Sequence, residues 1–109
     1  MTDTKHYTYR VSWSGEDGEF VATVVEFSSL SWLHPDQGEA LRGLVALVDE
    51  VVADLRAASE PVPDPIADRH FSGKFNVRVP ASLHRELVLA AAEEGVSLNR
   101  LVSDRLAHT

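Results

Sequence analysis

The sequence contains no cysteine and no apolar run long enough to cross a membrane. The lack of cysteine excludes a disulfide framework and any metal site built from thiolates. Residues 1–4, MTDT, do not have the pattern of a secretory signal peptide. We therefore expect a cytoplasmic protein. Its composition, 44% hydrophobic and 25% charged, is ordinary for one or two small folded domains.

Groups of residues that would support catalysis are also missing. A metal-dependent nuclease needs carboxylates on a central strand to hold Mg²⁺, but the first predicted strand, residues 7–13, has no Asp or Glu. Asp49 and Glu50 are adjacent on a predicted helix and so diverge, and the acidic residues at 16–19 crowd a turn. The histidines share no metal-binding spacing; they are His6, His34, His70, His84 and His108. We predict no enzyme activity, no catalytic residue, no metal and no cofactor.

Basic residues are scarce overall, with 10 Lys+Arg against 17 Asp+Glu and a net charge of -7. The excess of acidic residues is confined to one part of the chain. Residues 1–70 hold 5 basic and 13 acidic residues, a net charge of -8, whereas residues 71–109 hold 5 and 4, a net charge of +1. The acidic part should repel DNA and attract a basic protein, and the second part is free of that repulsion.

Residues 1–58 have the pattern of an antiparallel sheet covered by one helix. Strict alternation predicts a strand at 7–13, a turn follows at 14–18, and a second strand is expected at 20–27. Residues 30–33 are expected to add a short third strand. The side chains expected to face the core are Tyr7, Tyr9, Val11 and Trp13 from the first strand and Phe20, Ala22 and Val24 from the second.

A long helix is expected to begin after Asp36, with Glu39 three residues on in a capping-box arrangement. Its predicted buried stripe is Leu41, Leu44, Val48, Val51 and Leu55, widened by Val45, Leu47 and Val52. Gly43 costs about 1 kcal/mol of helix propensity relative to Ala, which the apolar area offsets. Trp13 and Trp32 are expected to be core or interface anchors.

Residues 59–72 carry prolines at alternate positions, Pro61, Pro63 and Pro65. Such a pattern favours an extended, semi-rigid spacer, so we place a linker between the two domains here. An edge strand containing Val62 and Ile66, added to the first sheet, is an open alternative.

Residues 73–109 begin with a short alternating strand. Phe75, Val77 and Val79 face one side of it, and Lys74, Asn76 and Arg78 face the other. Pro80 ends the strand and suits the start of a helix.

Two helices are predicted after Pro80. Gly95 is expected to end the first in the left-handed conformation, and Ser97 to cap the second. Their apolar stripes are Leu83, Leu87, Ala90 and Ala91 in the first helix and Leu98, Leu101, Val102 and Leu106 in the second.

One strand and two short helices cannot close a core, and a lone strand leaves its backbone groups unpaired. A second copy would solve both problems through an antiparallel two-stranded ribbon. The predicted dimer core is Phe75, Val77, Val79, Leu87, Leu101 and Leu106. The other side of the ribbon would present Lys74, Asn76 and Arg78 to the DNA major groove. The start of the last helix, Ser97, Leu98 and Asn99, would bind phosphate. This part of the chain resembles a ribbon-helix-helix DNA-binding domain.

Residues 72–99, SGKFNVRVPASLHRELVLAAAEEGVSLN, closely resemble the C-terminal domain of HicB-like antitoxins. YTYRVSW, a turn, FVATVVEF and a leucine-rich helix resemble their N-terminal domain. The resemblance implies an α+β fold: a partial RNase H-like β-β-β-α-β domain without nuclease activity, and a ribbon-helix-helix domain completed by dimerisation. It also implies that the first domain neutralises a small basic RNA-cleaving toxin of the HicA kind, and that the second represses the protein's own operon. Ser28 and Ser29 stand where many relatives have Pro or Gly.

Our first hypothesis is therefore a HicAB-type antitoxin and autorepressor, a homodimer with a tetramer also open. The alternative is a solitary ribbon-helix-helix regulator whose first domain oligomerises or senses a ligand. A toxin gene beside this one would separate the two. A relict RNase H enzyme is a third class, which metal-dependent RNA cleavage would reveal.

Overall fold

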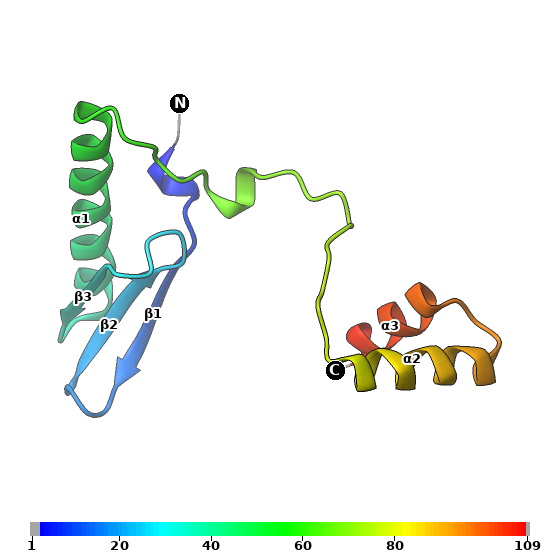
Figure 1. Ribbon diagram of the computed structural model, residues 1–109. Helices are drawn as coiled ribbons and strands as arrows, with labels where there is room; N and C mark the ends of the chain where they lie inside the picture. Colours follow the sequence, from blue (N-terminus) through cyan, green and yellow to red (C-terminus); the bar gives the residue numbers. More distant parts are fainter. Residues whose placement is uncertain (1–2, 109) are drawn as a thin grey trace. The chain divides into compact units, whose positions relative to one another are not determined.

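The structure, a computed structural model, describes residues 3–108. Its contacts divide the chain into two units, Met1–Phe71 and Ser72–Thr109. The first unit contains a sheet and a long helix, and the second contains two helices, so the protein is of the α+β class (Figure 1). None of the helices in residues 3–108 combines the length and apolar character that crossing a membrane requires.

The sheet of the first unit has three antiparallel strands in the order β1-β2-β3. They are β1 (Tyr9–Ser14), β2 (Glu19–Val24) and β3 (Ser31–His34). The predicted strands are confirmed, but their bounds shift. Tyr7 precedes β1, and β2 ends at Val24, because the chain turns away from the sheet before Phe27.

The register places the apolar members of β1 and β2 on one face of the sheet. Val11 pairs with Ala22, Tyr9 with Val24, and Trp13 with Phe20. Ala22 and Val24 are buried, as expected for this face. Trp13 is 58% exposed and makes an edge-to-face contact with Phe20, with ring centroids 5.0 Å apart. Trp13 is therefore not a core anchor, because its ring lies near the end of the strand and outside the buried cluster of the core. The alternative role of an interface anchor stays a prediction.

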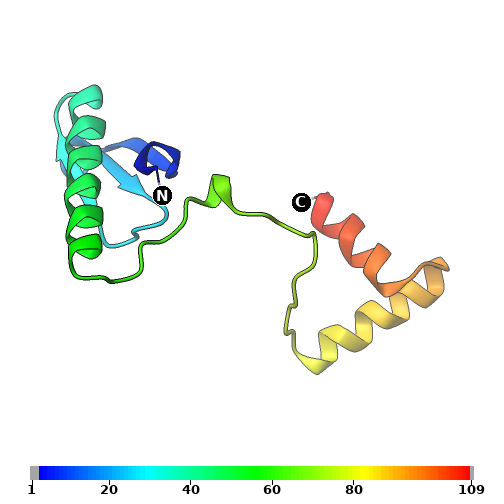
Figure 2. The same ribbon diagram turned by 90° about the horizontal axis from the view of Figure 1, so that it is seen from above.

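Helix α1 (Gln37–Ala57) packs along that face of the sheet (Figures 1 and 2). Asp36 caps it, since its Oδ1 accepts from the Glu39 amide at 2.9 Å. The reciprocal half of the predicted capping box is absent. The Asp36 amide donates to His34 Nδ1, and the Glu39 carboxylate accepts from Arg42 instead.

The buried stripe of α1 is rotated from the predicted one. Ala40, Leu44, Val48 and Val52 are its fully buried members. Leu41 is 37% exposed, and Val51 and Leu55 are half-buried. A helix with apolar residues around more than half of its circumference does not fix which part faces the sheet, so the sequence pattern alone left the rotation undetermined.

The chain that follows α1 returns to the sheet unit without forming a strand. Residues 59–65 have no regular structure, and a short 3₁₀ helix, η2 (Ile66–Asp68), follows. Val62 packs against the core and Pro65 is fully buried. Alternate prolines remove every N–H on one side of an extended segment, so the final strand of a β-β-β-α-β arrangement and the edge strand considered above do not form here.

The second unit contains α2 (Ala81–Glu94) and α3 (Leu98–Ala107), which pack on each other. Gly95 ends α2 with φ 70°, and Ser97 Oγ accepts from the Arg100 amide at 3.0 Å. Both terminal signals predicted from the sequence are confirmed. Ala91 and Leu101 are the buried residues of this pair of helices.

Candidate functional site

Residues 71–80 hold the side chains predicted to contact DNA bases. No strand is assigned in this stretch of the single chain, and all ten residues are exposed. Lys74, Asn76 and Arg78 are therefore accessible, but no strand pairing fixes them in one register. The predicted strand requires a partner strand for its backbone hydrogen bonds, so a single chain leaves it unformed.

The apolar residues of the same stretch are exposed too. Phe75 is 74% exposed, Val77 67% and Val79 37%. Three apolar side chains at alternate positions form a row along one side of an extended segment. Exposed apolar surface of this kind is typical of an interface that another chain covers.

The predicted phosphate-binding segment lies at the start of α3. Ser97 acts as N-cap and Asn99 is exposed, whereas Leu98 is half-buried. The Leu98 side chain therefore contributes packing, and only its backbone N–H is suited to an anion. Arg100 lies next to this helix start, where it forms an exposed ion pair with Asp104 at 3.6 Å, a type of pair that contributes little stability.

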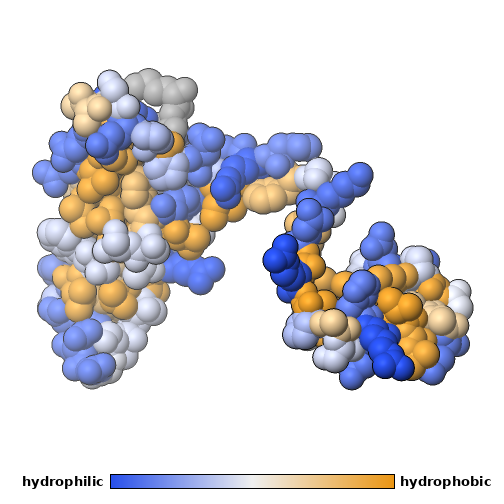
Figure 3. Space-filling model, viewed as in Figure 1, coloured by the Kyte–Doolittle hydropathy of each residue, from blue (hydrophilic) through white to orange (hydrophobic). Residues whose placement is uncertain are grey.

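The remaining predicted dimer-core residues differ in exposure. Leu101 is buried between the helices of its own chain and Leu87 is half-buried, whereas Leu106 is 57% exposed. Leu101 thus already contributes to the fold of one chain. Leu106, like the row in residues 75–79, lies open on the surface of the single chain, and Figure 3 shows apolar surface exposed across this unit (Figure 3).

A second apolar face of α2 was not predicted. A shallow groove there is lined by Ala81, His84, Arg85, Val88, Leu89 and Ala92. Val88 is 48% exposed and Leu89 59%. The signal in the sequence is that these two residues follow Leu87 directly, so they fall outside the stripe that packs on α3.

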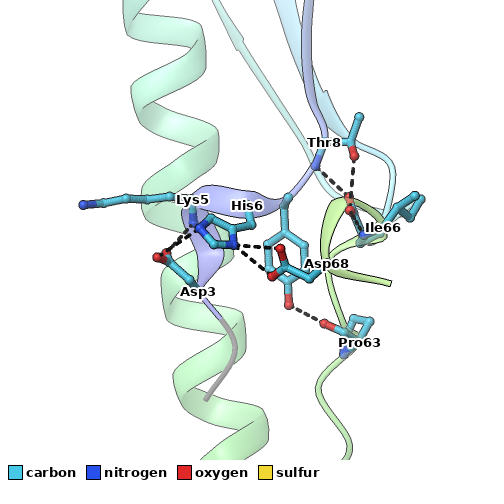
Figure 4. Close-up of polar contacts among 9 residues, drawn as sticks. Asp3, Lys5, His6, Thr8, Pro63, Ile66 and Asp68 are labelled. Carbon is cyan, nitrogen blue, oxygen red and sulfur yellow. Dashed lines mark hydrogen bonds and ion pairs between the residues drawn. The ribbon is translucent and has the colours of Figure 1, made fainter. Parts of the chain in front are cut away.

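A polar cluster in the first unit was also missed. The Glu26 carboxylate accepts from the amides of Thr8 and Ile66, and His6 Nδ1 lies 2.8 Å from Asp68 Oδ2 (Figure 4). Each contact joins residues at least eighteen positions apart in the sequence. No local motif indicates such a cluster, because only the folded chain brings its members together.

The carboxylates of the first unit do not form a metal centre in the described part of the chain, where no group of three or more His, Asp or Glu residues is placed to hold a metal ion. Asp17 accepts from the Ser14 hydroxyl within the β1–β2 turn at 2.9 Å. Asp49, Glu50 and Asp54 are exposed on α1. The first unit keeps the acidic excess, with 13 acidic and 5 basic residues in 1–71.

The fold and this surface define a two-unit α+β protein whose second unit is an extended segment, a helix, a glycine turn and a second helix. The sequence model of the HicB family matches residues 59–106, so the chain is HicB-like over that stretch. HicB is a family of antitoxins from toxin–antitoxin systems. Neither the curated proteins nor the solved structures contain a match to this chain.

Proposed function

We propose that the protein is an antitoxin that represses its own operon through a dimeric ribbon-helix-helix unit and neutralises a basic RNA-cleaving toxin through its acidic unit. The observation that carries the proposal is the row of exposed apolar residues, Phe75, Val77 and Val79, within the HicB-like stretch. A second copy that pairs with this segment would cover the row and leave the opposite side polar.

The polar side of that ribbon supports DNA binding. Lys74, Asn76 and Arg78 alternate with the apolar row, so pairing would bring two copies of each onto one surface. Arg and Lys suit guanine, and Asn suits adenine, in the major groove. The second unit has a net charge of +1, so it lacks the acidic excess with which the first unit repels DNA.

A gel shift on the DNA upstream of the gene tests this half of the proposal. The Lys74/Asn76/Arg78 triple-alanine variant should lose specific binding, and Arg78→Ala alone should cost about 1–3 kcal/mol of binding free energy. The matched control is the Lys5/Arg10 double-alanine variant, which also removes two positive charges, but from the sheet unit. Equal binding by the triple variant and the wild-type protein would reject the base-contact assignment.

The acidic unit supports the toxin-binding half. Its net charge of -8 attracts a basic protein and repels nucleic acid. The protein should be co-expressed with a small basic protein encoded by an adjoining gene. The two should form a complex that survives purification and whose affinity falls as the salt concentration rises. DNA binding without such a complex would favour the solitary regulator, in which the sheet unit oligomerises or senses a ligand.

A further inference from the structure

The segment of residues 61–68 is held on the sheet unit by side chains and not by strand pairing. We call this segment the clasp. Because Pro61, Pro63 and Pro65 have no N–H, the clasp cannot form a continuous ladder with β1 on the side that they face. Its attachment therefore depends on a small number of separate contacts, and such an attachment can open without unfolding the sheet.

Glu26 makes the central contact of the clasp. Its Oε2 accepts from the Ile66 amide at 2.9 Å, and its Oε1 accepts from the Thr8 amide at 2.9 Å (Figure 4). The Thr8 hydroxyl adds a third bond at 3.2 Å. One carboxylate thus joins the residue that precedes β1 to the start of η2. Hydrogen bonds to an ionised acceptor are stronger than neutral ones.

Tyr7 and Pro63 provide the second contact. The Tyr7 hydroxyl donates to the Pro63 carbonyl at 2.7 Å, and its ring is 4% exposed. Pro65 is fully buried. The clasp is thereby attached to an aromatic residue of the core, which also makes an edge-to-face contact with Phe27.

His6 and Asp68 form the third contact, at the C-terminal end of the clasp. His6 Nδ1 lies 2.9 Å and 2.8 Å from the two carboxylate oxygens of Asp68. His6 also faces Asp3 of its own segment, with Nε2 3.5 Å from Oδ2. On the adjacent helix α1, the Asp49 carboxylate accepts from the Thr4 hydroxyl. His6 therefore faces two carboxylates, those of Asp3 and Asp68.

We propose that the clasp is a latch whose opening lengthens the tether between the two units, and that loss of the His6 proton promotes opening. This inference stands apart from the proposed DNA and toxin binding. With the clasp closed, the chain without regular structure before α2 is residues 69–80, which span at most about 40 Å. Opening adds residues 59–68 and raises the limit to about 75 Å. The range over which one unit can reach from the other is set by this length.

The sign of the pH effect follows from the contacts. The hydrogen bond that His6 donates to the Asp68 carboxylate, and the negative charge of that carboxylate, raise the pKa of His6. A raised folded-state pKa contributes stability below the ordinary pKa of histidine and loses it as pH rises through the folded value. Burial pushes the pKa of Glu26 up, but the amide hydrogen bonds of Ile66 and Thr8 outweigh burial and lower it. The clasp should therefore be tightest in weakly acidic solution.

Hydrogen exchange of the full chain tests the latch. Glu26→Gln removes the charged acceptor, so the Ile66 amide should exchange on the order of tenfold faster, while the amides of β2 change little. Asp64→Asn is the matched control, because it neutralises an exposed carboxylate of the clasp that none of these contacts uses. Unchanged Ile66 protection, or Ile66 exchanging only together with β2, would overturn the proposal.

The pH dependence has its own test, which the absence of cysteine makes simple. Cysteines at exposed Ala53 and Ala67 would carry a donor and an acceptor dye and report the open fraction. That fraction should rise severalfold between about pH 6 and about pH 8.5. In the His6→Gln background it should stay constant over this range. An open fraction that does not respond to pH in the wild-type protein, or that responds equally without His6, would overturn the assignment of His6.

Discussion

Gly43 is in the middle of a 21-residue helix, where glycine is normally unfavourable. The structure explains its presence, because the Trp32 indole of β3 lies against it. A Cβ at position 43 would overlap the Nε1, Cδ1 and Cε2 atoms of Trp32. Trp32 is 42% exposed, so it packs on the surface of the helix. It is not a core anchor, which was one of the two roles predicted for it.

We predict that Gly43→Ala destabilises the protein although it improves helix propensity. Forcing Trp32 away should cost about 1–3 kcal/mol, against a propensity gain of about 1 kcal/mol. Chemical denaturation should show a net loss of unfolding free energy, and the emission of Trp32 should shift to longer wavelength in a Trp13→Phe background.

The control for Gly43→Ala is Ala53→Gly, which changes propensity at an exposed position of the same helix. The change in its unfolding free energy gives the difference in helix propensity between Ala and Gly in α1. If Gly43→Ala stabilises the protein by that same amount, the close packing of Trp32 on Gly43 has no energetic consequence, and our explanation of the glycine is wrong.

At the scale of the element, the turn between α2 and α3 depends on one backbone conformation. Gly95 has φ 70°, and no atom lies within 4 Å of where its Cβ would be. Gly95→Ala should therefore act through backbone strain alone and cost about 1 kcal/mol of stability. Gly95→Asn should cost less, because Asn tolerates the left-handed conformation. Thermal melts of the two variants measure these losses of stability. Equal losses would mean that the presence of a side chain, and not the positive φ, causes the destabilisation.

The elements that the sequence predicted well are those whose signals are local. Alternation located β1 and β2, and Asp36, Gly95 and Ser97 marked helix ends. The rotation of α1 was not predictable, because Leu41 is as apolar as Leu44 and only the sheet decides between them. The docking of residues 61–68 on the sheet unit could not be predicted from the sequence for another reason. It depends on Glu26 and Tyr7, which are distant in sequence and belong to no motif.

At the scale of the whole molecule, charge and apolar surface are distributed differently between the units. The sheet unit has a net charge of -8 and its own buried core, whereas the helical unit has a net charge of +1 and leaves apolar residues exposed from Phe75 to Leu106. The first unit buries a core within one chain. Within the second unit a single chain buries Ala91 and Leu101. The candidate DNA-contact residues can therefore be named from the sequence, but the geometry proposed for them depends on pairing with a second chain.

We predict that the wild-type protein is a dimer in solution and that Val77→Asp makes it a monomer. The ribbon proposed here buries Val77, and an unpaired carboxylate there would be strongly unfavourable. Asn76→Asp introduces the same charge at the adjacent position, on the side that the ribbon leaves open, and should remain dimeric. Sedimentation velocity distinguishes the two species, and circular dichroism verifies that both variants keep their helices. A folded dimer of Val77→Asp together with a monomer of Asn76→Asp would mean that the faces are reversed. Two dimers would mean that the chains associate elsewhere, for example through the groove that contains Val88 and Leu89.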